Sequence, residues 1–304
     1  MKLVRTARSA ARAWAVPALL LSVGVASLGC GASRQEGWEV ASAATSGSAA
    51  DFAAARESAL GHWAQRGEAS HLQMAIDGLE AAYKIDPTNV EVASLISRAY
   101  YLKAERDAAN DDDRLRLYEI GTQRGEQAMS IDRKFRDAMK AGGDYGDAVR
   151  GLGAEYVPAM YWTAVNLGRW SRARGFTTVL ANRRKVQHLV TRVTELDSTY
   201  FHGAPDRYWG AYYSIAPGFA GGDKDKSKVH FERALRIQPA YIGTKVTYAE
   251  TYAVGVQNRE LFQRLLTEAI AMDVNALPDV VPEQMNEQAK AKVFLSRIDE
   301  LFAR

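Results

Sequence analysis

A nine-residue pattern of apolar, small and polar positions recurs five times along the chain. Its copies begin at positions 79, 125, 190, 231 and 266 and read LEAAYKIDP, GEQAMSIDR, VTRVTELDS, FERALRIQP and LTEAIAMDV. The fourth position is Val193 in one copy and a small alanine in the others: Ala82, Ala128, Ala234 and Ala269. An aliphatic or methionine residue follows three positions later on the same helical face. Because Pro87 and Pro239 cannot continue a helix, the pattern predicts the closely packed end of a helix.

Further helices are predicted between the copies, over residues 90–103 and 242–254, from apolar residues at spacings of three and four. The last two copies begin 35 residues apart, at 231 and 266. This spacing and the closing proline resemble tetratricopeptide repeats, which are helical hairpins of about 34 residues. We therefore expect an all-α protein of about four to five such hairpins with inserts, forming a solenoid or a compact helical array. The alternative is an irregular helical bundle.

The first 29 residues have the pattern of a bacterial secretory signal. Residues 13–29 carry no charge, and the charges before them are all basic: Lys2, Arg5, Arg8 and Arg12. Cys30, the only cysteine, follows this apolar run directly. We expect cleavage before Cys30 and acylation of its thiol, although Leu28 stands two residues before the cysteine and the usual lipoprotein site has leucine three before. The alternative is an uncleaved transmembrane anchor with an incidental cysteine.

These features divide the chain into a signal peptide (1–29), a lipidated cysteine with a flexible tether (30–50) and a helical repeat domain (51–304). The tether is expected because residues 31–50 are mostly Gly, Ala and Ser. No second apolar run of membrane-spanning length occurs, so the lipid anchor is the only expected membrane contact. Gly31 follows the cysteine in place of an aspartate, which favours the outer over the inner membrane, with the body facing the periplasm.

The net charge argues against a nucleic-acid partner. The precursor carries +3, and four of its positive charges lie in residues 1–29, which leaves −1 after cleavage. A protein that binds nucleic acid needs a concentrated basic surface to displace counterions.

An acidic insert spans residues 107–114 and contains three consecutive aspartates, Asp111, Asp112 and Asp113. Their carboxylates could bind a hard cation, but the glycine and final glutamate of a calcium loop are missing. We favour an exposed loop that caps the helix from Arg114 onward, and expect no metal site.

An aromatic insert contains the first candidate binding residues, Tyr161, Trp162, Asn166 and Trp170. Large rings at helical spacing are often plain core. A polar Asn166 among them also suits a ligand channel or a protein interface. The sequence leaves the two interpretations open.

A third insert adds Tyr208 and Trp209 as channel or interface candidates and ends in the turn Gly221, Gly222 and Asp223. Pro217 and the glycines break the helix, and Asp223 can cap the next one. Free backbone amides at this turn could cradle an anion. The spacing of a nucleotide-binding loop is absent, so we favour a structural turn.

The aromatic helix and the turn with the following residues 230–234 resemble the T component of tripartite ATP-independent periplasmic (TRAP) transporters. The resemblance covers the body from about Gly61 to the C-terminus and includes the lipoprotein site. It implies a lipoprotein homotrimer with tetratricopeptide-like hairpins and an apolar pore through each subunit. The implied partner is the periplasmic solute-binding (P) subunit, and the implied ligand is a hydrophobic molecule or an organic acid. Tyr161, Trp162, Asn166 and Trp170 carry over as channel or interface residues, whereas Gly221, Gly222 and Asp223 carry over without an assigned role.

An enzymatic function is not expected, and no cofactor is implied. The five histidines form no metal-binding pair, and no nucleophile turn of the Gly-x-Ser-x-Gly kind occurs. Two other functions remain open beside the transporter component. One is a general envelope scaffold of tetratricopeptide type for protein–protein interactions, and the other is an assembly factor for the outer membrane.

Overall fold

The computed structural model describes residues 34–40 and 46–302, and the signal peptide and Cys30 lie outside these ranges. Helices dominate the described residues, which contain no strand. The all-α prediction is therefore confirmed. None of the helices within these ranges is long and apolar enough to cross a membrane.

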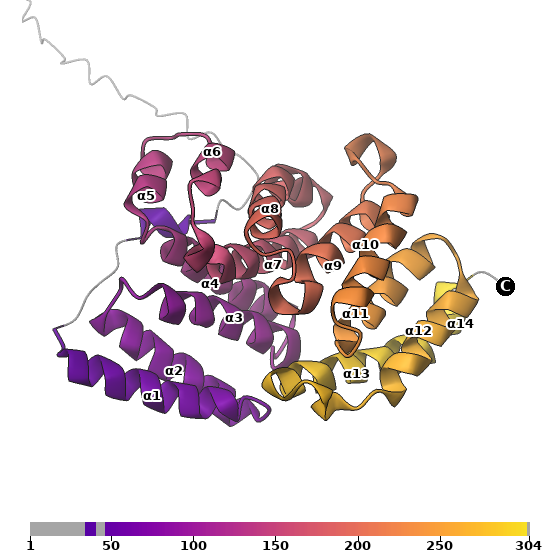
Figure 1. Ribbon diagram of the computed structural model, residues 1–304, viewed down its shortest axis with the longest axis horizontal. Coiled ribbons are helices and arrows are strands. Elements are labelled where there is room, and N and C mark those ends of the chain that lie inside the picture. The colour runs from indigo at the N-terminus through magenta and orange to yellow at the C-terminus, as the bar shows by residue number, and fades with distance from the viewer. Residues whose placement is uncertain (1–33, 41–45, 303–304) are drawn as a thin grey trace, which may run out of the picture. The chain divides into compact units, whose positions relative to one another are not determined.

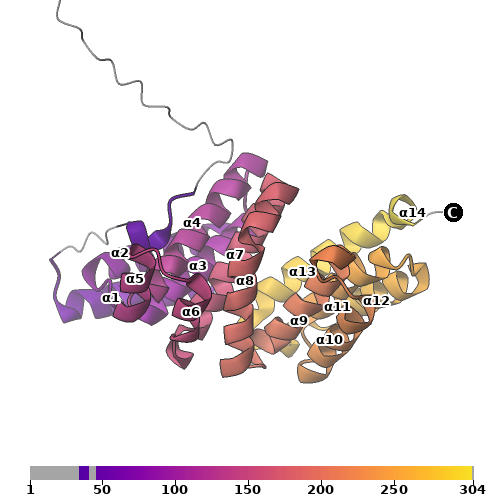
Figure 2. The same ribbon diagram turned by 90° about the horizontal axis from the view of Figure 1, so that it is seen from above.

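Consecutive helices pack against one another as pairs (Figure 1). The first pair is α1 (Ala49–Ala64) with α2 (Ala69–Ile85), and the second is α3 (Val90–Arg106) with α4 (Asp111–Met129). Two short helices follow, α5 (Arg133–Lys140) and α6 (Tyr145–Arg150). The third pair is α7 (Val157–Arg174) with α8 (Phe176–Leu196), which lie side by side in Figure 2 as well.

The C-terminal part continues this arrangement. Helix α9 (Tyr200–Ile215) pairs with α10 (Lys224–Ile237). Helix α11 (Ile242–Thr247) runs on into a π-helical segment (Tyr248–Ala253), and both pack against α12 (Arg259–Ala271). The predicted helix over 242–254 is thus present with a π-helical second half. Helix α13 (Val281–Ser296) packs on α11 and α12, and the short α14 (Ile298–Leu301) follows.

The recurring pattern marks the end of the second helix in each of these five hairpins. It closes α2, α4, α8, α10 and α12. The residue at its fourth position is fully buried every time: Ala82, Ala128, Val193, Ala234 and Ala269. In α2, α8 and α10 the carbonyl of this residue also accepts the backbone N–H that caps the helix. The pattern therefore supplies both the small buried residue that allows close helix packing and the end of the helix. The tetratricopeptide type of the hairpins stays a prediction.

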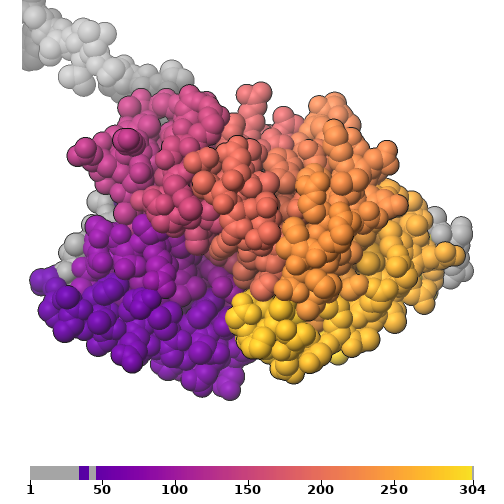
Figure 3. Space-filling view, in the orientation of Figure 1, coloured from indigo at the N-terminus to yellow at the C-terminus, as the bar shows by residue number. Residues whose placement is uncertain are grey.

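The apolar core falls into two large clusters. One is built from residues between Trp38 and Ala204, and the other from residues between Phe231 and Phe302. Ion pairs join α13 to α3 and to the connection between α1 and α2. Glu283 pairs with Arg66 at 2.9 Å and with Arg98 at 2.7 Å, and Lys290 pairs with Glu105 at 2.5 Å. Figure 3 shows the yellow surface of α13 in contact with the surface of the N-terminal helices.

The tether prediction is corrected at residues 34–40, which pack against the body. Gly37 and Trp38 are buried in a short 3-10 helix (Gly37–Glu39). The physical reason is that Arg34, Gly37 and Trp38 contact α4, α5 and α8, so this segment buries surface despite its small-residue neighbours.

Candidate functional site

A cavity of about 250 Å³ lies among α3, α7, α9, α11 and α13. Its aromatic lining residues are Tyr101, Tyr161, Trp162, Phe201, Tyr208 and Tyr241. Trp162 lies at the centre of the ring contacts: its ring centroid is 4.9 Å from that of Tyr161, 5.0 Å from that of Phe201 and 5.4 Å from that of Tyr101. An apolar, aromatic lining of this kind suits a small molecule with a flat or aliphatic body.

Charged groups line the same cavity: Arg169, Arg172, Arg207, Lys290, Glu250 and Glu287. Most of the cations face a carboxylate, as Arg172 faces Glu250 at 3.8 Å and Lys290 faces Glu287 at 2.9 Å. Arg207 differs, because its guanidinium donates to two backbone carbonyls and lies over the Tyr241 ring at 4.3 Å. The cavity thus combines aromatic walls with a small excess of positive charge, a combination that tolerates an organic acid.

A left-handed turn inside α9 positions Phe201 in the cavity. Phe201, His202 and Gly203 have φ values of 43°, 61° and 76°, a region that residues with a side chain rarely adopt. The Arg207 guanidinium holds the turn by donating to the carbonyls of His202 at 2.6 Å and Phe201 at 3.0 Å. Such conformations persist only where the surrounding structure enforces them and cluster at functional sites.

Arg98 connects this turn to α13. Its guanidinium lies over the Phe201 ring at 4.8 Å and over the Trp162 ring at 5.4 Å, and it pairs with Glu283. Burial raises the pKa of Glu283, but Arg98 and Arg66 outweigh this effect, so the net shift is downward. Glu283 is therefore a carboxylate at neutral pH, and it holds two arginines beside the aromatic wall.

Three of the predicted candidate residues line the cavity: Tyr161, Trp162 and Tyr208. Asn166 is buried elsewhere in α7 and donates to the carbonyls of Ser97 at 3.1 Å and Trp162 at 2.9 Å. A Cβ on Gly121 of α4 would lie 2.6 Å from the Asn166 Oδ1, so Asn166 occupies the close crossing of α3, α4 and α7. The structure places Asn166 as a packing residue at that crossing.

Trp170 and Trp209 lie outside the lining of this cavity. Trp170 is buried in the core that includes α7 and α8, with Arg174 over its ring at 5.7 Å. Trp209 is partly buried among tyrosines, with its ring 5.2 Å from Tyr208 and 5.8 Å from Tyr213. Sequence reasoning could not separate these two tryptophans from Trp162, because all three lie on helices rich in aromatic residues.

The turn with Gly221, Gly222 and Asp223 is structural, as favoured from the sequence. Asp223 caps α10 by accepting the Lys226 N–H at 3.0 Å. The amides of all three turn residues donate to backbone carbonyls at 2.9–3.0 Å, so they are not available to an anion. Gly221 has φ 91°, and a Cβ on Gly222 would lie 1.8 Å from the Ala216 carbonyl oxygen. Only glycines fit these two positions.

The acidic insert begins α4. Asn110 accepts the Asp113 N–H at 2.9 Å, so the helix starts at Asp111, three residues earlier than predicted. In the described part of the chain, no three His, Cys, Asp or Glu side chains come close enough together to hold a metal ion.

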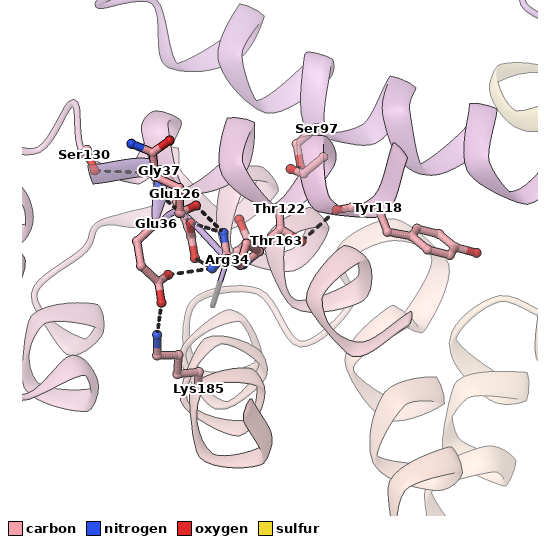
Figure 4. Close-up of polar contacts among 12 residues, drawn as sticks. Arg34, Glu36, Gly37, Ser97, Tyr118, Thr122, Glu126, Ser130, Thr163 and Lys185 are labelled. Carbon is pink, nitrogen blue, oxygen red and sulfur yellow. Dashed lines mark hydrogen bonds and ion pairs between the residues drawn. The ribbon is translucent and has the colours of Figure 1, made fainter. Parts of the chain in front are cut away.

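Sequence reasoning missed the segment of residues 34–40, which we call the N-terminal strap. Figure 4 shows Arg34 between two carboxylates: it contacts Glu126 at 2.5 Å and Glu36 at 2.5 Å, and Lys185 of α8 pairs with Glu36 at 2.7 Å. The Gly37 N–H also donates to Glu126 at 2.7 Å. Burial raises the pKa of Glu126 to about 7, although Arg34 opposes the shift. The strap therefore supplies the polar partners of a carboxyl group buried in α4.

A family model described as TRAP transporter T-component matches residues 72–302, which is most of the chain and includes all the cavity-lining residues. A search of curated proteins finds no match. The chain therefore belongs to the TRAP transporter T-component family, whose members are envelope-associated, non-catalytic components of a transport system.

Proposed function

We propose that the protein is a periplasm-facing lipoprotein that docks the solute-binding (P) subunit of a TRAP transporter and holds a hydrophobic ligand or an organic acid in its aromatic cavity. The observation that carries the proposal is the cavity itself, in which Trp162 contacts rings from α3, α7 and α9. The family membership supports the link to the transporter.

The anchor and the oligomeric state belong to the same proposal. Acylation of Cys30, preferentially at the outer membrane, would keep the body at a membrane surface, and a homotrimer would place three cavities together. Cys30 lies outside the described residues, so its acylation remains a prediction from the sequence. Mass spectrometry of the purified native protein tests it, and light scattering of residues 31–304, which include the compact unit from residue 34 onward, tests the trimer.

The partner is tested by calorimetric titration of residues 31–304 with the solute-binding protein encoded nearest to this chain. Saturable heat with a defined stoichiometry supports the transporter component. A well-folded protein that gives no heat at high concentration would refute the docking and favour the general envelope scaffold.

The cavity is tested with 2-naphthoate, a probe that has an aromatic body and a carboxylate. Trp162→Ala removes a cavity wall, so we expect it to weaken binding about tenfold or more, the scale of a lost aromatic anchor. Trp170→Ala is the matched control, because Trp170 is equally buried in the same helix but does not line the cavity (4% and 5% exposed). Equal effects of both variants would show that the loss comes from destabilisation and would overturn the ligand site.

A further inference from the structure

A second concave site lies beside the cavity. It is a groove of about 430 Å³ between α8 and α9, beginning at the end of α7 and closed by the turn at Pro217. Its walls are mainly apolar and include Phe176, Val179, Leu180, Val186, Ile215 and Pro217. Three of these side chains are conspicuously exposed: Phe176 at 57%, Ile215 at 54% and Leu180 at 41%. Large exposed apolar side chains gathered around one groove indicate a binding surface.

Two polar atoms of the groove are donors that lack partners. Ser171 Oγ and Arg183 Nε are both buried, and neither has a hydrogen-bond partner in the described part of the protein. Among the described residues, the Arg183 guanidinium makes a single hydrogen bond, a long one of 3.4 Å to the Ala220 carbonyl. Buried donors are nearly always satisfied in folded proteins, so such atoms point to a ligand that supplies the acceptor.

The charge of the groove has one sign. Arg172 and Arg183 both line it, and no aspartate or glutamate does among the described residues. Arg172 is largely exposed, and its nearest carboxylate, that of Glu250, is 3.8 Å away. The lining therefore offers guanidinium donors and an apolar wall, which are complementary to an anion attached to a hydrocarbon.

We propose that this groove binds a single-chain amphipathic carboxylate, with its tail along Leu180 and Ile215 and its head group accepting from Arg183, with Ser171 and Arg172 as the other donors. Arginine matches a carboxylate in charge and in the geometry of its paired donors. A volume of about 430 Å³ is at the small end of ligand sites, which span about 300–1,000 Å³, and so favours one free chain over a two-chain membrane lipid.

The groove adjoins the aromatic cavity, and five residues line both: Gly168, Arg172, Tyr208, Ala211 and Ile215. Trp162 and Phe201 belong to the cavity alone, whereas Leu180 and Arg183 belong to the groove alone. The inference is therefore independent of the proposed transporter role, and variants of these residues separate the two sites.

The test is calorimetric titration of residues 31–304 with decanoate below its micelle concentration. We expect saturable binding. Arg183→Met should weaken binding about tenfold or more, as for a lost charge-assisted hydrogen bond. Arg184→Met is the matched control, because Arg184 neighbours Arg183 on α8 but is exposed and does not line the groove. Trp162→Ala, which alters the wall of the cavity and not of the groove, should weaken decanoate binding less than Arg183→Met does.

Chain length and head group supply a second readout. Each further methylene that enters the apolar groove should tighten binding about fourfold, so octanoate, decanoate and dodecanoate should form a graded series. Decanol has the same tail without the charge and should bind about tenfold or more weakly than decanoate. Leu180→Gln should flatten the series, and its exposed position makes the change compatible with folding.

Five results would overturn the proposal. The first is equal decanoate binding by the Arg183→Met and Arg184→Met variants, and the second is decanol binding as tightly as decanoate. Loss of decanoate binding in Trp162→Ala but not in Arg183→Met would move the amphiphile to the cavity, leaving the proposed function intact. The last two results both begin with a groove that does not bind decanoate. If Ile215→Glu then lowers the mass measured by light scattering, the groove is an interface between copies of the chain. If Arg183→Met then abolishes co-sedimentation with anionic vesicles, the groove is a membrane-binding surface.

Discussion

Glu105 joins four helices beside the cavity. It lies on α3 with its side chain 8% exposed, and it pairs with Lys290 of α13 at 2.5 Å and with Arg169 of α7 at 3.3 Å. The Tyr118 hydroxyl of α4 donates to the same carboxylate. Burial by itself raises the pKa of Glu105, but Arg169 and Lys290 outweigh it and lower the pKa to about 2. The carboxylate is thus stabilised by the folded structure, and its removal should be measurable.

The pKa shift sets the size of the effect. A fall from 4.5 to about 2 corresponds to about 3 kcal/mol, because one pKa unit is worth about 1.4 kcal/mol. Since the pKa is lower in the folded than in the unfolded state, this stability is complete above about pH 4.5. It is lost as the pH falls toward 2. We therefore expect Glu105→Gln, which removes the charge and keeps the shape, to lower the free energy of unfolding by about 3 kcal/mol at pH 7 and about 1 kcal/mol at pH 3.

Urea denaturation followed by circular dichroism measures this difference at several pH values between 7 and 3. Glu57→Gln is the control, because Glu57 is exposed on α1 and the substitution removes the same charge. It should change stability by less than about 0.5 kcal/mol at each pH. A loss in Glu105→Gln that stays constant across this range would refute the ion-pair argument and indicate a packing defect. No loss at pH 7 would show that desolvation of the carboxylate cancels the benefit of its partners.

Three further predictions concern the packing around the site. Trp38→Ala should lower the free energy of unfolding by about 3–5 kcal/mol in urea denaturation, because the ring is buried against Phe135 with a 6.1 Å centroid distance; unchanged stability would show that the strap is not part of the fold. Gly121→Ala should cost about 1–3 kcal/mol by the same measurement, because its Cβ would meet Asn166, and the added Asn166→Ala substitution should recover part of the loss. Gly222→Ala should lower the melting temperature in calorimetry, because its Cβ meets the Ala216 carbonyl; an unchanged temperature would show that the turn can shift freely.

Much of the helical architecture could be predicted because its signals are local. The recurring pattern places a small residue, an aliphatic residue and a helix stop within nine positions, and each copy ends the second helix of a hairpin. The cap at Asp223 was also predictable, since a short acceptor before a helix is a local signal. The ends of these five helices and the cap at Asp223 could therefore be predicted from the sequence alone.

The strap and the cavity could not be predicted because they depend on contacts far apart in the chain. Arg34 donates a hydrogen bond to Glu126, which lies 92 positions further along the sequence, whereas the composition around Arg34 indicates an unstructured tether. The left-handed turn at residues 201–203 has glycine at only one of its three positions, so the sequence there does not indicate a left-handed backbone. Asn166 looked like a ligand contact because it is polar among rings, yet its partners are the backbones of α3 and α7.

The distribution of apolar and charged contacts explains how the cavity is bounded. The first large apolar cluster draws on residues up to Ala204, and the second draws on residues from Phe231 onward. The cavity is lined by residues from both of these parts of the chain. On the α13 side, Glu283 pairs with Arg66 and Arg98, and Lys290 pairs with Glu105, so these contacts with the N-terminal part of the chain are ion pairs. Ion pairs specify geometry and respond to pH, whereas apolar packing does not titrate. The wall formed by α13 should therefore loosen before either apolar cluster does, and for this reason the pH profile of Glu105→Gln reports on the cavity as well as on global stability.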